Sequence, residues 1–176
     1  MKLSILDQSV AIADKCQDQV INDTLNLSTI AEELGYFRFW ISEHHNHPTI
    51  IGTAPEILMA AIAAKTNKIR IGSAGIMLPH YSPFKVAEQF RVLNSLAPNR
   101  IDLGLGRAPG SDGRTALALN SNNREFSENF PSHVRDLIAW VTNGDLLEGH
   151  PFGRLKAQPI SLSLIHISEP TRQKPI

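Results

Sequence analysis

The stretch RIDLGLGRAPGSD, residues 100–112, joins a short apolar run to a glycine-rich turn. Residues 101–105 have the length and composition of a buried strand, and small and charged residues follow them directly. In parallel α/β folds, functional residues gather after the carboxyl ends of such strands. We therefore predict a strand at 101–105 and a functional loop behind it.

Three similar apolar runs precede this one, and the four recur about every 33 residues, which indicates one repeated unit. Helical periodicity fills the intervals, and a further helix is predicted at about 131–142. Alternating strands and helices imply parallel strands with crossover helices. Both an open doubly wound sheet and a closed eight-unit barrel fit this pattern, and periodicity alone does not separate them. The predicted strands are residues 3–6, 37–42, 69–75 and 101–105.

Local signals predict where the helices begin and end. Gly35 is expected as a left-handed C-cap, because glycine lacks the Cβ that makes this conformation costly. Thr53 and Glu56 have the spacing of a capping box. Ser82 is expected as an N-cap with Pro83 as the first helical residue, where the missing N–H of proline costs nothing.

Composition excludes several classes of function. The chain has 176 residues, 42% of them hydrophobic, and equal numbers of basic and acidic residues, 17 each. Zero net charge gives no reason to expect a nucleic-acid partner, and no apolar run reaches the roughly 18 residues of a membrane span. Cys16 is the single cysteine, so no intramolecular disulfide forms, which fits a reducing compartment. We expect a cytoplasmic protein that binds neither nucleic acid nor membrane.

The stretch EHHNH, residues 43–47, follows the second predicted strand. Neutral imidazole suits proton transfer near neutral pH and also binds metals. His44 and His45 point in opposite directions along extended chain, so they do not easily share an ion, and no further ligand pattern completes a site with His47. We expect no metal and favour a catalytic or ligand-positioning role. The alternatives are a plain solvated loop and a metal-assisted hydrolase that also uses Glu43.

The stretch SAGIMLP, residues 73–79, ends the third predicted strand with small residues. Small residues allow a flat ligand to approach the backbone closely. They also suit a strand that only has to pack tightly inside a barrel. The sequence gives these two interpretations equal weight.

The stretch GLGRAPG, residues 104–110, resembles a dinucleotide loop, but Pro109 stands where the third glycine would be. It is better interpreted as a flexible turn that displays Arg107. The guanidinium is suited to bidentate binding of a phosphate. The competing interpretation is a surface arginine paired with Asp102 or Asp112.

Taken together, these segments resemble the bacterial luciferase-like flavin-dependent monooxygenases, specifically their single-chain FMN oxidoreductase branch. The likeness extends over about residues 1–160 and implies an α/β fold, the N-terminal half of a (β/α)8 TIM barrel with four parallel strands and crossover helices. The stretches that carry it are FWISEHHN (39–46), GSAGIMLP (72–79), SPFKVAEQF (82–90) and residues 96–113.

The resemblance implies a flavoprotein that uses reduced FMN and O2 to oxidise a small organic substrate, with FMN reduced by a separate NAD(P)H-dependent flavin reductase. His44 aligns with the histidine that assists proton transfer. Ala74 and Gly75 align with a strand end, often containing a cis peptide, that lies against the flavin ring, and Arg107 aligns with an arginine that reaches the FMN phosphate. The implied site residues are His44 as catalytic residue and Glu43, His45, Ala74, Gly75 and Arg107 for cofactor binding.

Residues 161–176 do not resemble the family's fifth strand, and we interpret them as a non-native tail of translated adapter sequence. Because a barrel of this kind needs about 250 residues, the chain is expected to supply half a barrel, to bind FMN poorly and to be inactive alone. The alternatives are a non-catalytic flavin- or phosphate-binding module and a deazaflavin-dependent hydride-transfer enzyme of the same barrel. A homodimer that covers exposed strand edges also stays open.

Overall fold

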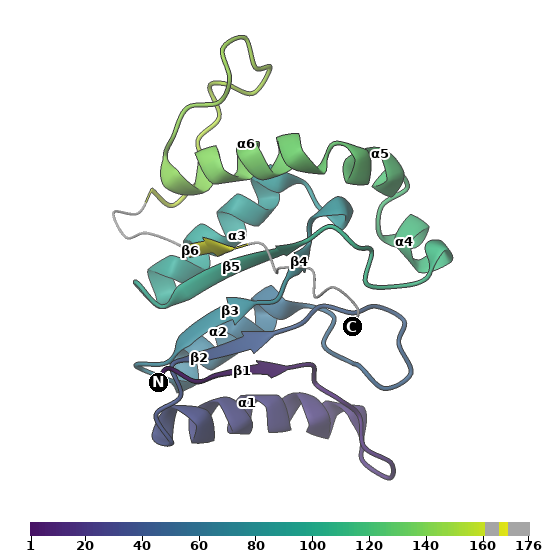
Figure 1. The fold of residues 1–176 in the computed structure, drawn as a ribbon, viewed down its shortest axis with the longest axis vertical. Coiled ribbons are helices and arrows are strands. Elements are labelled where there is room, and N and C mark those ends of the chain that lie inside the picture. Colours follow the sequence, from purple (N-terminus) through teal and green to yellow (C-terminus); the bar gives the residue numbers. More distant parts are fainter. Residues whose placement is uncertain (161–165, 169–176) are drawn as a thin grey trace.

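A parallel sheet forms the centre of the chain in the computed structural model, which describes residues 1–160 and 166–168. Apart from the two-residue strand β4 (Ile76–Met77), strands adjacent in space are also consecutive in sequence (Figure 1). Such an order winds in one direction only, as a barrel does, whereas a doubly wound sheet reverses its order. The sheet runs β1 (Ser4–Asp7), β2 (Arg38–Ile41), β3 (Arg70–Ser73), β5 (Ile101–Gly106) and β6 (His166–Ser168), all parallel.

The third predicted strand is divided into two parts. After β3, residues Ile76–Met77 form β4, which pairs with β5 farther along, Ile76 opposite Leu105. Both β3 and β4 therefore pair with β5. The predicted run at 69–75 marked the correct place in the fold, although the ladder is interrupted at Ala74 and Gly75.

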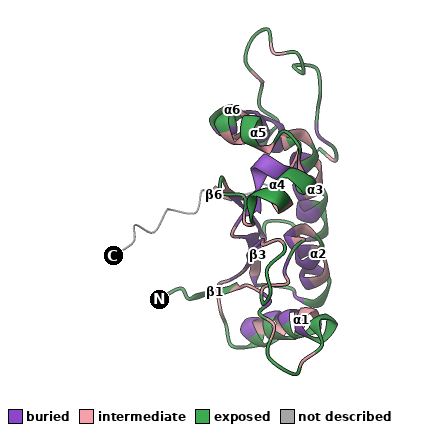
Figure 2. Cartoon of the chain, turned by 90° about the vertical axis from the view of Figure 1, so that its right-hand side faces the viewer, coloured by how far each residue is buried: buried purple, intermediate pink, exposed green. Residues whose placement is uncertain are grey.

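The long helices all cover one face of the sheet. Figure 2 shows them on one side of the strands, and no described helix covers the opposite face. This one-sided layer confirms the predicted half of a (β/α)8 barrel and excludes the doubly wound alternative. None of the described helices is long and apolar enough to cross a membrane. The helices are α1 (Gln17–Glu33), α2 (Pro55–Lys65), α3 (Pro83–Leu96) and α6 (Phe130–Thr142).

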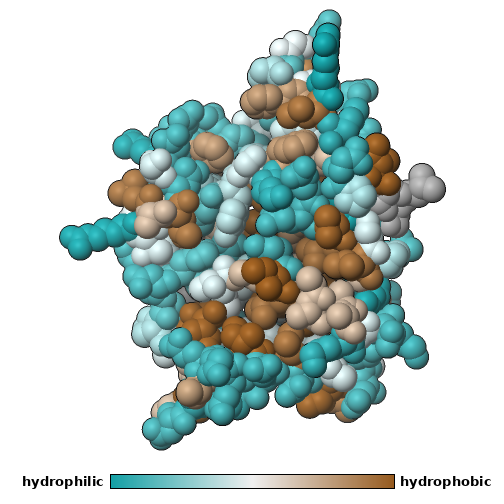
Figure 3. Space-filling view, turned by 180° about the vertical axis from the view of Figure 1, so that it is seen from behind, coloured by the Kyte–Doolittle hydropathy of each residue, from teal (hydrophilic) through white to brown (hydrophobic). Residues whose placement is uncertain are grey.

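The hydrophobic core lies between the sheet and this helical layer. Along each strand, alternate side chains point towards the helices, as in β2, where Phe39 and Ile41 are fully buried. Phe90 of α3 and Leu137 of α6 are equally buried on the helical side. Each such side chain contributes about 1.5–3 kcal/mol through removal from water. On the other side of the helices, apolar side chains lie among polar ones (Figure 3).

A buried carboxylate links three strands near their amino ends. Asp102 of β5 has no exposed surface and accepts hydrogen bonds from Arg38 Nε at 2.9 Å, Trp40 Nε1 at 3.1 Å and Arg70 Nη2 at 2.5 Å. Arg38 belongs to β2 and Arg70 to β3. An ionised group is stable away from water only when it is paired and hydrogen-bonded, so Asp102 holds these strands together on the uncovered face.

Two glycines allow β3, β4 and β5 to approach each other closely. A Cβ on Gly104 would lie 2.2 Å from the carbonyl oxygen of Ser73, and a Cβ on Gly75 would lie 2.8 Å from the backbone of Gly104. The Ser73 hydroxyl bridges the same gap, donating to the Gly104 carbonyl at 2.9 Å. Tight packing between strands therefore accounts for the small residues of this segment.

The helix ends follow two of the three sequence signals. Gly35 has φ +77°, and Tyr36 N–H donates to the Ala31 carbonyl at 3.0 Å, which completes the expected C-cap. Ser82 is the N-cap of α3, with Pro83 as its first residue. The predicted capping box is wrong: α2 begins at Pro55, after Ala54. Because Pro55 itself occupies the first helical position, Thr53 lies outside the helix.

The polar stretch after β5 contains two short helices that the sequence analysis did not predict. They are α4 (Gly113–Leu119) and α5 (Asn123–Glu128). Asp112 starts α4 by accepting hydrogen bonds from the backbone of Arg114 and Thr115.

Part of the segment interpreted as a non-native tail is described, and part is not. Residues 166–168 form β6, which pairs in parallel with β5, Leu103 opposite Ile167. Residues 161–165 and 169–176 lie outside the described residues. The origin of residues 161–176, and the domain boundary at 160, stay predictions.

Gly104→Ala is expected to lower the free energy of unfolding by about 2–3 kcal/mol, because the added methyl group meets a backbone carbonyl that cannot rotate away. Gly113→Ala is the control, since a Cβ there meets nothing within 4 Å. The control should change stability by less than about 1 kcal/mol. Urea unfolding followed by circular dichroism measures both, and equal losses would contradict the close-packing account.

Asp102→Asn is expected to lower the free energy of unfolding by about 2–3 kcal/mol, because two arginines lose their counter-charge. The loss stays below that of a fully enclosed pair, since Arg38 and Arg70 keep side-chain exposures of 27% and 22%. Glu128→Gln breaks an exposed ion pair with Arg124 and should cost under about 0.5 kcal/mol. A similar thermal shift for both variants would show that the Asp102 cluster is not a structural element.

Candidate active site

Three loops predicted to carry function meet at the carboxyl edge of the sheet, on the right of Figure 1. His45 N–H donates to the Gly110 carbonyl at 3.0 Å, which joins the loop after β2 to the loop after β5. Ala74 N–H donates to the Ile41 carbonyl at 2.7 Å, which brings the end of β3 beside the end of β2. The parallel ladder thus collects segments that are distant in the sequence.

Glu43 is the centre of this region. It has no exposed surface, and its Oε1 accepts from His45 Nε2 at 2.7 Å and from the Tyr81 hydroxyl at 2.6 Å. Its Oε2 accepts from Met77 N–H at 2.9 Å. These donors come from the loop after β2, from β4 and from the residue after η1 (Leu78–His80). One carboxylate therefore fixes three segments relative to each other.

Tyr81 takes part through its hydroxyl, which stays protonated. Burial is the first cause that raises the pKa of Tyr81 well above its usual value, and the charge of Glu43 and its hydrogen bond add to the effect. Glu56 of α2 is a second carboxyl group nearby, and burial followed by the charge of Glu43 raises its pKa. Two carboxyl groups of one region thus differ in environment: Glu43 has three donors, whereas Glu56 is half-buried.

His44 lies next to this cluster but is not part of its hydrogen bonds. Its Nδ1 is buried and has no partner among the described residues. Burial first, and then the neighbouring His47 and His45, lower the pKa of His44, while Glu43 opposes the shift. The imidazole of His44 is therefore neutral near pH 7 and able to accept a proton.

His80, after β4, extends the cluster towards the loop after β5. Its Nε2 lies 2.7 Å from the Pro109 carbonyl, and its ring meets that of His45 edge-on at 5.7 Å. The sequence analysis missed both His80 and Tyr81. The signal was available, because these two titratable residues follow a strand end just as residues 43–47 do.

Ala74 and Gly75 are joined by a cis peptide bond, the feature that the resemblance associates with this strand end. Ala74 is partly exposed, and Gly75 is buried against the backbone of β5. Of the two interpretations of this segment, packing explains Gly75 directly. A role in cofactor binding stays a prediction.

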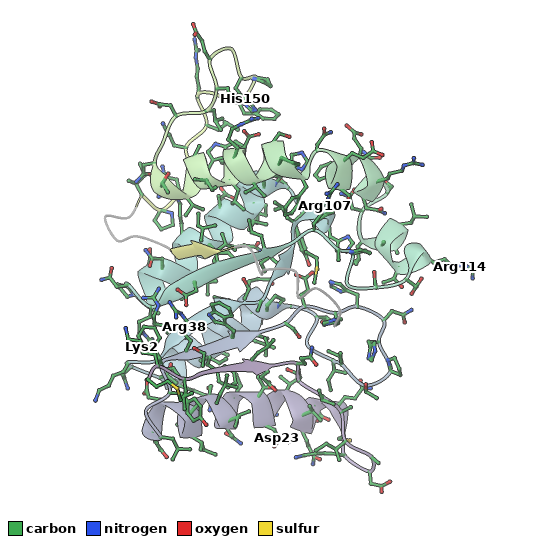
Figure 4. All side chains as sticks on the ribbon, in the orientation of Figure 1. Lys2, Asp23, Arg38, Arg107, Arg114 and His150 are labelled. Atoms are coloured by element: carbon green, nitrogen blue, oxygen red, sulfur yellow. The ribbon has the colours of Figure 1, made fainter. Side chains whose placement is uncertain are left out.

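Arg107 extends from the carboxyl end of β5, whereas Arg38 lies near the amino ends of the strands (Figure 4). Arg107 is exposed, and its Nε donates to the Ser127 carbonyl at 3.3 Å. The proposed pairing with Asp102 or Asp112 is wrong. Asp102 is bound by the strand arginines, and Asp112 caps α4 and accepts from Asn46 at 3.1 Å. The charge of Arg107 therefore has no carboxylate partner among the described residues.

The groups at this edge have the chemistry that proton transfer and contact with a flat or anionic group require. Across residues 1–160 and 166–168, no three metal-ligating side chains converge. Neutral His44, the strand end at 74–75 and the cation of Arg107 all follow carboxyl ends of strands. Glu43 and His45 contact each other directly, while no described hydrogen bond joins Arg107 to them.

Comparison with known proteins agrees with this geometry. The family profile of luciferase-like monooxygenases matches residues 1–129. The uncharacterised protein YwcH of Bacillus subtilis is 46% identical over 160 residues, covering 90% of this chain and 47% of that protein. N-acetyl-S-alkylcysteine monooxygenase of the same organism is 43% identical over 159 residues, again 90% of this chain and 47% of that protein. The crystal structure of apo-MsnO8 superposes with a TM-score of 0.84 at 36% identity and covers 96% of this chain and 49% of that one.

The chain thus spans about half the length of the curated relatives it matches. Its sheet corresponds to half of the barrel in the structural relative. The sequence match covers β1 to β5 and their loops, which include every residue of the site described above. The chain belongs to the luciferase-like monooxygenase family.

Proposed function

We propose that this chain is the amino-terminal half of an FMN-dependent monooxygenase, and that the whole protein uses reduced FMN and O2 to oxidise a small organic substrate. One observation carries the proposal: neutral His44, the strand end at Ala74–Gly75 and the cation of Arg107 lie at the same edge of one parallel sheet. This edge is where α/β barrels bind their substrates.

The residues present fit a flavin. The buried Nδ1 of His44 lacks a hydrogen-bond partner, which a polar group of a bound ring system would provide. Ala74, a small and partly exposed residue, would let a flat ring approach the strand end closely. Arg107 offers a guanidinium for the phosphate.

Each of these residues would have a separate role in the whole protein. Arg107 would bind the phosphate, and Ala74 with Gly75 would support the ring. His44, neutral because burial lowers its pKa, would accept or return a proton beside the ring. Reduced FMN supplies the electrons with which O2 is activated. A separate NAD(P)H-dependent reductase would deliver it in reduced form.

The names of relatives support oxidation of an organic molecule, since one of them is an N-acetyl-S-alkylcysteine monooxygenase. Proteins that share the fold bind either FMN or the deazaflavin F420. At 22% identity, a 3,6-diketocamphane monooxygenase constituent was solved with FMN, and at 14% identity an F420-dependent alcohol dehydrogenase was solved with an F420–acetone adduct. We favour FMN because the motifs at 39–46, 72–79 and 96–113 resemble the FMN branch.

The chain alone is expected to bind FMN only weakly, because the other half of a barrel would complete the binding groups. Fluorescence titration of FMN with the purified chain measures this, and circular dichroism shows whether the chain is folded. We expect no saturation at micromolar protein. Stoichiometric FMN in the folded, monomeric chain would overturn this expectation.

In the whole protein, Arg107→Ala is expected to weaken FMN binding by about 10- to 100-fold, because one charge-assisted contact to the phosphate is lost. Riboflavin, which lacks the phosphate, should bind equally to both proteins. Arg114→Ala is the control, since Arg114 is also exposed but belongs to α4. Equal weakening for riboflavin and FMN would show that Arg107 does not bind the phosphate. A preference for F420 in the same titration would favour the deazaflavin alternative.

A further inference from the structure

Both carboxylate oxygens of Glu43 already accept hydrogen bonds from the protein. Its Oε1 has two donors, His45 Nε2 at 2.7 Å and the Tyr81 hydroxyl at 2.6 Å, and its Oε2 has Met77 N–H at 2.9 Å. The side chain is fully buried. Met77 N–H and the Tyr81 hydroxyl donate to it, so the group acts as an acceptor at both oxygens. It is an internal acceptor that holds the loops together.

The same contacts determine the proton position on His45. An ionised carboxylate only accepts hydrogen bonds, so Nε2 of His45 must be the donor. In the neutral ring, Nδ1 is then unprotonated and basic. Nδ1 makes no hydrogen bond with any described residue, and the side chain retains 10% exposure.

His44 and His45 are thus adjacent in the sequence but have different surroundings. His44 has no carboxylate contact, and burial lowers its pKa. The ring of His45 instead contacts the Glu43 carboxylate, with 2.7 Å between Nε2 and Oε1.

The other titratable groups near His45 are His47 in its own loop, His80 and Tyr81 after β4, and Glu56 of α2. Burial, aided by Glu43, raises the pKa of Tyr81, so its hydroxyl remains a donor to Glu43 throughout the neutral range. None of these side chains, apart from Tyr81, competes for the Glu43 oxygens.

We propose that Glu43 is a positioning residue for His45: it fixes the imidazole with the proton on Nε2 and presents Nδ1 as a second proton-accepting atom beside His44. The site then contains one histidine that stays neutral and one whose ring donates to a buried carboxylate. The role beside a flavin rests on the proposed function, whereas the arrangement of the two residues does not.

The test is to determine the histidine tautomers of the chain, without flavin, by long-range 1H–15N NMR at neutral pH. Single His→Gln variants assign the signals. Wild-type His45 should have its proton on Nε2, by about tenfold over Nδ1. A wild-type ring protonated on Nδ1 overturns the proposal, whether or not any variant folds.

Glu43→Gln should reverse this ratio. If the new amide oxygen accepts from Met77 N–H, its NH2 group faces His45 Nε2, which must then accept, so the proton moves to Nδ1. Glu56→Gln is the matched control, because it alters a nearby half-buried carboxyl group that does not contact His45. It should leave the tautomer unchanged.

Tyr81→Phe removes one donor but keeps the carboxylate, and should also leave the proton on Nε2. Reversal in either control would mean that the loop as a whole, rather than Glu43, sets the tautomer, and would contradict the proposal. Because no flavin is present, failure of flavin binding would leave this result standing. Conversely, if His45 carries its proton on Nδ1, the flavin-binding titrations still test the proposed function.

Discussion

The buried charge of Glu43 is the constraint on which the candidate site depends. A carboxylate without exposed surface requires donors, and here they come from three separate segments: His45, Met77 and Tyr81. Loops that would otherwise move independently on the sheet edge are therefore held in one arrangement.

A second buried carboxylate, Asp102, does the same for the amino-end part of the sheet. It holds Arg38 and Arg70, whereas Glu43 holds polar loop residues at the carboxyl end. The two anions lie at opposite ends of parallel strands. One is surrounded by permanent cations and supports the strands; the other has a titratable ring among its partners and supports the candidate chemistry.

The sequence predicted the architecture well because parallel strands that are buried by helices leave clear apolar runs. All four expected strands occur, and the one-sided helical layer agrees with the barrel implied by the resemblance. The division into β3 and β4 was not predictable from periodicity, because it depends on how closely Gly75 and Gly104 approach. The predicted capping box does not form, because Pro55 is the first helical residue and Thr53 lies outside the helix.

For the site, local patterns found the correct loops but not their contacts. His44, His45 and Arg107 lie where strand ends predicted them, yet neither expected partner of Arg107 was correct, because Asp102 and Asp112 are engaged elsewhere. Tyr81 joins Glu43 across 38 positions of the chain, and no local pattern encodes such a contact.

The sequential order of the strands has a consequence for biosynthesis. In a barrel that winds in one direction, each new strand is added beside the one made just before it. The contact between the loops after β2 and β5, His45 to Gly110, needs no residue beyond the loop that follows the fourth barrel strand. In a protein of this family, these two loops can therefore meet while the second half of the chain is still being translated.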